Sequence, residues 1–191
     1  LGLVGKMQEN PVRSDQPTET VTLVPMGCAR LRISAFPRIG SRPDAHEWKV
    51  RDRVRFSHCF GGDTPAALND GIVPDSSGDQ SIPRFTWWNH RGTTEWVEYR
   101  FGEDTEISSS AVYWFDDRGQ GQCRVPESWE LLYLEDGEWT PVEGVESYGT
   151  QRDRFNEVEF EPVKTKAVRL RAQLRPEYSG GILEWRVDGA E

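Results

Sequence analysis

The segment EWVEYRF (residues 95–101) decides the fold class, because apolar and polar side chains alternate along it. Successive side chains of an extended strand point to opposite faces, so this period of two residues is typical of a strand buried on one face. The segments AVRLRAQL (167–174) and LEWRV (183–187) repeat the alternation. In the last segment the residues expected to point inward are Leu183, Trp185 and Val187. The chain is therefore expected to be built from half-buried strands.

Turn signals between the strands indicate how they are connected. Asp136-Gly137, between two apolar stretches, predicts a tight hairpin whose flanking strands are antiparallel neighbours. One short helical turn is expected at 64–68, with Thr64 as its N-cap and Pro65 at its first position. Further strands are expected near 107–115, 128–134, 138–142 and 154–161. Strands that recur about every ten residues predict an all-β fold, and an antiparallel jelly-roll β-sandwich is favoured.

The charge of the chain restricts its partners. Its 191 residues contain 23 Lys and Arg against 32 Asp and Glu, which gives a net charge of −9. This charge would repel a phosphate backbone or an anionic membrane, so neither nucleic acid nor a membrane is an expected partner. No run of about 18 apolar residues is present to span a bilayer. Neutral ligands and cations fit the chain better.

The sequence carries no recognisable catalytic motif. The three histidines are scattered, and no HExxH, GxSxG or Walker-type motif is present, so the chain alone is not expected to be an enzyme. The three cysteines include no CxxC pair. We expect Cys59 and Cys123 to be buried as small apolar residues, with a disulfide between them as the alternative.

Residues 1–40 differ from the rest of the chain. Two strands are expected at 20–25 and 29–36, and a linker follows at 37–44. The segment TVTLVPMGCARLRISAFP (20–37) resembles the closing strands of glycoside hydrolase family 127, the β-L-arabinofuranosidase-like proteins. This resemblance implies that the chain comes from the C-terminal end of a larger bacterial glycosidase-like protein, secreted or periplasmic, whose barrel-shaped catalytic domain is not in this chain.

Residues 41–191 are expected to form a second unit. From about Arg53 onward the chain is similar to discoidin-like modules, the galactose-binding-like fold shared by family 32 carbohydrate-binding modules and coagulation factor C-type domains. The segments that carry this resemblance are ALNDG (67–71), TWW (86–88), WVEYRF (96–101) and GILEW (181–185). The resemblance implies a β-sandwich that binds a ligand without catalysing a reaction.

An acidic loop suggests a cation site. Asp70, Asp75 and Asp79 lie in a Gly- and Pro-rich stretch, and clustered carboxylates suit a hard cation such as calcium. In the family, the Asp-Gly turn and a Glu near the last strand share a structural calcium, which maps to Asp70 and Glu184. The expected ligands are thus Asn69, through its carbonyl, with Asp70, Asp75 and Glu184. The alternative is an ordinary turn, with Glu184 as an outward polar residue.

A second cluster suggests sugar recognition. Sugars stack an apolar face on an aromatic ring while planar polar side chains bind their hydroxyls. The stretch WWNHRG (87–92) offers these residue types together, and the expected contacts are Trp87, Trp88, Asn89, His90 and Arg91. In the alternative, one Trp fills the core beside a hydrogen-bonded turn, and at most one of the two is fully buried. The loop 115–124 is a second candidate, because its glycines permit unusual backbone angles and its polar side chains could reach a ligand. A structural role is favoured for it, with Asp116 or Asp117 paired to Arg124.

These features predict a non-catalytic carbohydrate-binding module of a larger glycosidase-like protein. Its expected partners are an arabinose- or galactose-containing glycan and the parent catalytic domain. The alternative is an accessory domain that packs against the catalytic domain and never contacts sugar.

Overall fold

The structure is a computed structural model that describes residues 54–188. The strands expected at 20–25 and 29–36, and the boundary expected between residues 40 and 41, lie outside the described residues. The elements, in chain order, are β1 (Val54–Phe56), the 3-10 helix η2 (Pro65–Asn69), β2 (Phe85–Thr86), β3 (Thr94–Phe115), β4 (Ser128–Glu135), β5 (Glu138–Pro141), β6 (Phe155–Gln173) and β7 (Gly181–Asp188).

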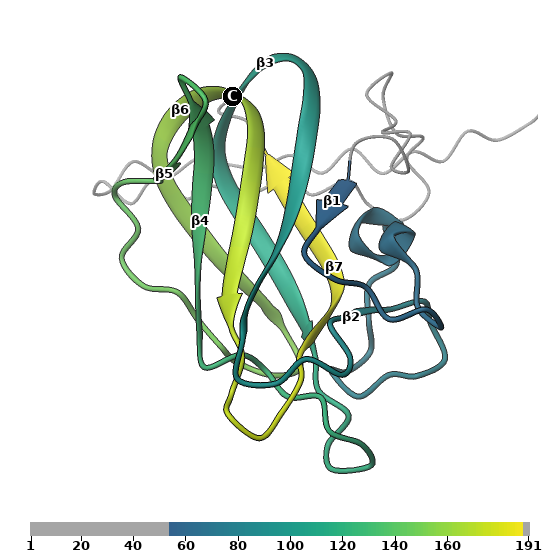
Figure 1. Cartoon of the computed structure of the whole chain (residues 1–191). Helices are drawn as coiled ribbons and strands as arrows, with labels where there is room; N and C mark the ends of the chain where they lie inside the picture. The colour runs from purple at the N-terminus through teal and green to yellow at the C-terminus, as the bar shows by residue number, and fades with distance from the viewer. Residues whose placement is uncertain (1–53, 189–191) are drawn as a thin grey trace, which may run out of the picture. The chain divides into compact units, whose positions relative to one another are not determined.

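Strands β3 and β6 are unusually long, with 22 and 19 residues. Each unites two strands that the sequence predicted separately, 95–101 with 107–115 and 154–161 with 167–174, so the predicted breaks were wrong. The pairing between β3 and β6 shifts register between Arg100 and Thr105 and again between Ile107 and Ser109. Such irregularities bend strands, and Figure 1 shows β3 and β6 bending over at its upper end.

The bend creates the two layers of a β-sandwich. One layer contains the first half of β3 and the second half of β6, together with β1, β4 and β5. The other layer contains the second half of β3 and the first half of β6, together with β7 and β2. All these pairings are antiparallel, so the predicted antiparallel β-sandwich is confirmed. Both ends of β3 and of β6 lie at the lower end of Figure 1, where the loops 87–93, 116–127 and 174–180 gather.

The core lies between the two layers and is rich in aromatic rings. Trp87, Trp114 and Trp185 are its largest fully buried side chains. The predicted alternation is confirmed at the end of β6 and the residue after it: Val168, Leu170, Ala172 and Leu174 are buried, and the residues between them are partly exposed. Burial of this apolar surface, worth about 25 cal/mol per Å², is the main stabilising term.

Strand β7 departs from the predicted pattern. Tyr113 pairs with Glu184 but Trp114 pairs with Ile182, so Leu183 is an extra residue in β7. Beyond this bulge Ile182, not Leu183, joins Trp185 in the main core, and Leu183 packs in a smaller cluster with Tyr113. The prediction that Leu183 and Trp185 share one inward face was therefore wrong.

The predicted local turns are confirmed. Asp136 and Gly137 have φ of 49° and 90° in the turn between β4 and β5, the left-handed conformation that a tight hairpin requires. The Thr64 side chain caps η2 by accepting a hydrogen bond from the Ala66 amide at 3.2 Å. Cys59 and Cys123 are free thiols, so the alternative of a disulfide between them was wrong. Cys123 is buried as predicted, whereas Cys59 is only partly buried. No helix within residues 54–188 is long and apolar enough to cross a membrane.

Candidate functional site

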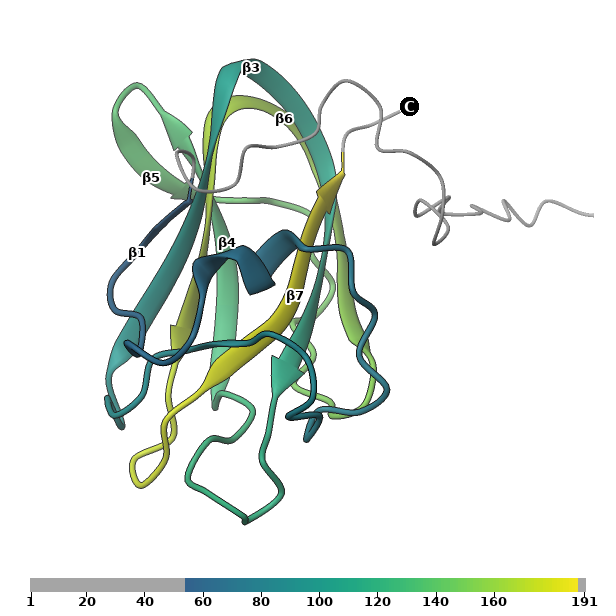
Figure 2. The ribbon, with the colours of Figure 1, turned by 90° about the vertical axis from the view of Figure 1, so that its right-hand side faces the viewer.

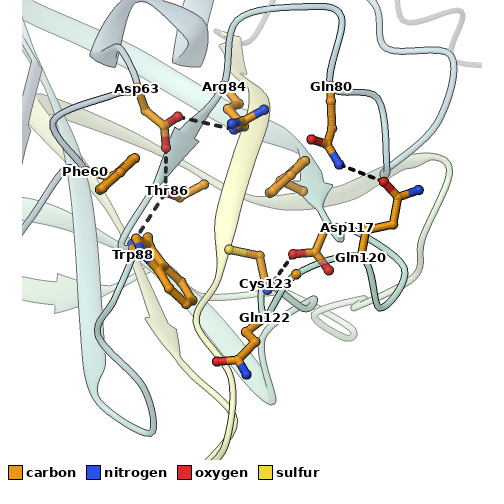
Figure 3. Close-up of a pocket in the computed structure, with 12 residues that line it drawn as sticks. Phe60, Asp63, Gln80, Arg84, Thr86, Trp88, Asp117, Gln120, Gln122 and Cys123 are labelled. Atoms are coloured by element: carbon orange, nitrogen blue, oxygen red, sulfur yellow. Dashed lines mark hydrogen bonds and ion pairs between the residues drawn. The ribbon is translucent and has the colours of Figure 1, made fainter.

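A pocket of about 350 Å³ opens between three loop segments (Figure 3). The segments come from before η2, from the chain around β2, and from the loop that follows β3. The lining residues are Phe60, Asp63, Gln80, Arg84, Thr86, Trp88, Phe115, Asp117, Gln120, Gly121, Gln122 and Cys123. Both aromatic and hydrogen-bonding side chains therefore face the same space.

Asp63 anchors one side of the pocket. Its buried carboxylate accepts a hydrogen bond from the Thr86 hydroxyl at 2.5 Å and forms an ion pair with Arg84 Nε at 3.2 Å (Figure 3). The Arg84 guanidinium also lies 5.3 Å from the centre of the Phe115 ring. These contacts fix the guanidinium and balance its charge, so this side of the pocket carries no unpaired charge.

Asp117 holds the opposite side. It accepts hydrogen bonds from Arg124 Nη1 at 2.6 Å and from the Cys123 amide at 2.9 Å. The predicted Asp117–Arg124 pair is thus confirmed, whereas Asp116 instead accepts from the Arg118 amide at 2.9 Å. The loop has the structural role that the sequence predicted, and in addition it carries Gln120 and Gln122 into the pocket.

Two aromatic rings border the pocket. The Phe60 side chain is 41% exposed, which is high for a large apolar residue, and the Trp88 ring is half-buried. The Arg91 guanidinium lies 5.3 Å from the centre of the Trp88 ring. The Trp88 carbonyl oxygen is 2.7 Å from His58 Nε2, which fixes the backbone beside the ring. An exposed aromatic face beside planar polar groups is the arrangement that sugar recognition requires.

The structure separates the five residues that the sequence proposed as sugar contacts. Trp88 lines the pocket, but Trp87 is fully buried in the core with its ring edge against Phe85, which removes Trp87 as a ligand contact. The prediction that at most one of the two tryptophans is fully buried is confirmed. Asn89 and Arg91 are exposed beside the pocket without lining it.

His90 has a structural setting. Its amide donates to the Trp87 carbonyl at 2.8 Å, and its ring stacks on His58 with centres 4.1 Å apart. Its Nδ1 lies 2.7 Å from the buried Glu95 carboxylate. Burial raises the pKa of Glu95, but the hydrogen bonds from Ser57, Thr93 and His90 outweigh it and lower the pKa overall. The hydrogen-bonded turn of the alternative interpretation is therefore present.

Phe60, Asp63 and Arg84 line the pocket but were not identified from the sequence. They lie in segments far from the loop 115–124 in the sequence, and only the folded sandwich brings them together. Among them, Phe60 alone could have drawn attention in the sequence, because it is a large apolar residue in a polar, glycine-containing stretch. No local spacing pattern connects it to Asp63 or Arg84.

The expected cation site is partly assembled. Figure 2 shows η2 beside β7, an arrangement that brings the Asp70-Gly71 turn toward Glu184. Burial raises the pKa of Glu184 to about 7; Arg186 lowers it, and the Asp70 charge raises it. Glu184 is 1% exposed, and its Oε1 accepts from Arg186 Nε at 3.2 Å. The Gly71 amide is close enough to lower the pKa of Glu184, but within residues 54–188 no hydrogen bond of good geometry reaches Oε2. Glu184 is thus buried, contrary to the alternative that it is an outward polar residue.

Asp75 stands apart from this pair. The electrostatic influence of Asp75 falls on Tyr113, together with that of Asp153 and Asp79, whereas Asp70 acts on Glu184. No three His, Cys, Asp or Glu side chains between residues 54 and 188 gather closely enough to hold a metal ion. A cation at Asp70 and Glu184 would therefore need backbone carbonyl oxygens as well, and the end of η2 at Asn69 leaves such groups free of helical bonds.

The long bent strands and the loops gathered at one end define the chain as an antiparallel β-sandwich domain. The family model for the F5/8 type C domain matches residues 55–185, and the chain belongs to this family. No curated protein matches the chain in sequence.

Solved structures with the same fold include sugar-binding modules. The chain is similar to a structure of the Streptococcus pneumoniae β-galactosidase BgaA, with 20% identity, a TM-score of 0.61, and coverage of 73% of this chain and 92% of that chain. The family 32 module of C. perfringens NanJ, solved with galactose, has 17% identity, a TM-score of 0.53 and coverage of 70% and 90%. Chitosan-binding module 1 of a Paenibacillus sp. IK-5 chitosanase/glucanase has 17% identity, a TM-score of 0.52 and coverage of 71% and 93%. At these identities the similarity shows the shared fold.

Proposed function

We propose that this domain binds a neutral glycan in the pocket between Phe60, Arg84 and Gln122. The observation that carries the proposal is the exposed Phe60 ring, which lies with Trp88 beside amide and carboxylate groups. A sugar ring would stack its apolar face on one aromatic ring while the amides bind its hydroxyls. Galactose in the NanJ module and chitosan in the Paenibacillus module make a sugar ligand reasonable for this fold.

The charges of the pocket favour a ligand without charge. Asp63 is paired with Arg84, and Asp117 is paired with Arg124. Because both carboxylates are paired with arginines, the pocket offers no unpaired charge to a charged ligand. Its hydrogen-bonding groups include the neutral amides of Gln80, Gln120 and Gln122. An arabinose- or galactose-containing glycan meets this requirement.

The same proposal extends to the whole protein. The resemblance of residues 20–37 to family 127 glycoside hydrolases supports a secreted or periplasmic bacterial parent enzyme, which this module would hold near its polysaccharide substrate. The module itself contributes binding, and the parent catalytic domain contributes the hydrolysis.

We further propose that calcium binds at Asp70 and Glu184. The unpartnered, buried Glu184 Oε2 fits a cation, because a buried polar atom without a partner is costly. Asp70 would supply a second carboxylate, and the Asn69 carbonyl would complete the set. The ion would brace the turn after η2 against β7.

Replacement of Phe60 by Ala tests the glycan site. We expect the affinity of the Phe60→Ala variant for arabinogalactan oligosaccharides to fall about tenfold, or about 1.4 kcal/mol, because a central aromatic contact is lost. Isothermal titration calorimetry on the full chain measures this change. Ile72→Ala is the matched control, since Ile72 is 39% exposed on a neighbouring loop and does not line the pocket.

The result separates binding from a purely structural role. If the wild-type chain retains no arabinose-, galactose- or glucosamine-containing glycan on an affinity gel, the accessory-domain alternative gains support. Equal losses in Phe60→Ala and Ile72→Ala would place binding elsewhere than in this pocket.

A further inference from the structure

A second hollow, a groove of about 570 Å³, lies where β3, β6 and β4 run side by side, and it reaches Trp129 and Tyr148 at the edge of the core. It is lined by Thr94, Ser128, Trp129, Glu130, Tyr148, Arg171 and Gln173. None of these residues lines the loop-end pocket, and most of them belong to regular strands rather than loops. The groove is therefore a separate feature with its own rigid support.

Strand register sets the positions of the lining side chains. Thr94, Gln173 and Ser128 are direct cross-strand neighbours on β3, β6 and β4. Two residues further along the same strands, Arg171 on β6 and Glu130 on β4 are also direct cross-strand neighbours. Neighbouring strands lie about 4.8 Å apart, so these polar groups form a compact array with little freedom to move.

An ion pair forms the centre of the groove. Arg171 Nε and Nη2 both approach Glu130 Oε1, at 2.8 and 2.6 Å. Within residues 54–188, no hydrogen bond involves Glu130 Oε2 or Arg171 Nη1, and both side chains are more than one third exposed. The pair therefore presents one acceptor and one donor to a ligand, while its charges cancel.

Tyr148 adds an oriented hydroxyl and an aromatic edge. Its oxygen accepts from the Leu131 amide at 3.2 Å, which leaves its proton free to be donated. Burial, with the Glu130 charge, raises the pKa of Tyr148, and the Leu131 contact lowers it, so the hydroxyl stays protonated. The ring packs on Trp129, whose Nε1 donates to the Gly149 carbonyl at 2.6 Å.

We propose that this groove is a second glycan-binding subsite that takes a neutral oligosaccharide. Thr94 donates to the Gln173 amide oxygen at 2.7 Å, and the Gln173 amide nitrogen donates to the Gly92 and Leu174 carbonyls, so these two side chains form a fixed wall of the groove. The paired carboxylate and guanidinium, with the Ser128 and Tyr148 hydroxyls, suit a polyhydroxylated ligand, because sugar hydroxyls donate and accept at once. The cancelled charges select against an ionic partner. Two subsites on one module would raise the avidity for a long polysaccharide that spans both.

Nuclear magnetic resonance of the full chain tests the subsite, with two tryptophan indoles as local reporters. The Trp129 indole reports on the groove and the Trp88 indole on the loop-end pocket. The neutral probes are hexasaccharides of galactan and arabinan, with a polygalacturonate hexasaccharide as the acidic comparison. We expect at least one neutral probe to shift the Trp129 indole and the amides of Glu130 and Arg171.

Variants assign those shifts to the groove. Arg171→Ala and Glu130→Gln should weaken binding at the Trp129 reporter by about fivefold, a loss typical of one hydrogen-bonding group. Exposed ion pairs contribute little to stability, so both variants should stay folded. Arg55→Ala is the control, because it removes an exposed arginine from β1 of the same layer outside the groove.

The outcomes of this experiment are separable from those of the loop-end pocket. Groove shifts that persist in Phe60→Ala support the subsite, even if the Trp88 reporter never responds. The proposal is overturned if every neutral probe leaves the groove reporters unchanged at millimolar concentration. Shifts that survive both Arg171→Ala and Glu130→Gln, or that only polygalacturonate produces, also overturn it.

Discussion

Glu184 makes stability depend on pH, because its carboxyl group is buried in the folded chain. Burial raises its pKa from 4.5 to about 7, with Arg186 acting against the change. Well below pH 4.5 the carboxyl group is protonated in both states, whereas between about pH 4.5 and 7 it is ionised in the unfolded chain but still largely protonated in the fold. In the presence of a chelator we expect the free energy of unfolding to fall by about 3 kcal/mol as pH rises from about 4.5 to 8.

Urea unfolding of the wild type and of Glu184→Gln measures this contribution. The Gln variant should lose most of the decline, and the remaining decline belongs to Asp70 and Asp188, whose pKa values are also raised by burial. Calcium at the same site would favour the ionised carboxylate, so adding it should stabilise the wild type more at pH 8 than at pH 5. Identical pH profiles for wild type and Glu184→Gln would contradict the burial argument, and an unchanged stability in calcium would contradict the proposed ion.

Residue-scale pattern reasoning did not predict the buried environment of Glu184, which was singled out only by the family resemblance. Glu184 alternates with Leu183 and Trp185, and strict alternation would have placed it on a solvent-facing side. The bulge at Leu183 interrupts that alternation and lets Ile182 and Trp185 enter the same core. A single extra residue in a strand leaves no mark in the sequence, because it depends on how the neighbouring strand pairs.

At the scale of elements, the hairpin between β4 and β5 depends on Gly137. Its φ of 90° lies in the left-handed region, where a side chain is strained. We expect Gly137→Ala to lower the free energy of unfolding by about 1 kcal/mol, since an L-residue is disfavoured there by about that amount. Gly61→Ala is the matched control, because a Cβ at Gly61 meets no atom within 4 Å and its φ is not positive.

Urea denaturation of the two variants separates backbone strain from the removal of glycine flexibility. Gly61→Ala should be neutral or slightly stabilising. A Gly137→Ala variant as stable as the wild type would show that the turn relaxes to another type at no cost.

Elements whose signals are local were predictable, and those set by long-range pairing were not. The Asp-Gly turn and the strand expected at 128–134 lie in adjacent residues, and the structure confirms both. The stretch GEDTE (102–106) reads as a polar turn, yet it is where β3 bends from one layer to the other. The strands β1 and β2 have only three and two residues and form by pairing with β3 and β7. Such short segments carry no sequence pattern from which a strand could be predicted.

At the scale of the whole molecule, the binding site was predictable only where one segment supplied it. Trp88 was found because aromatic and planar polar residues follow one another in 87–92. The rest of the pocket comes from three segments, and the sandwich brings them to one end. Sequence patterns identify the residue types that suit a ligand, but the side chains that face it are selected by burial, which sent Trp87 into the core.

The net charge of −9 leads to a prediction about salt, because both proposed sites hold their charges in pairs. A neutral glycan exchanges no counterions with such sites, so its Kd by calorimetry should change less than about twofold between 50 and 500 mM NaCl. Polygalacturonate is the comparison: repulsion by the acidic molecule should make its binding undetectable at 50 mM NaCl, with at most a small gain as salt screens the charges. Affinity for an acidic polymer that falls steeply with salt would show instead that unpaired arginines form the binding surface.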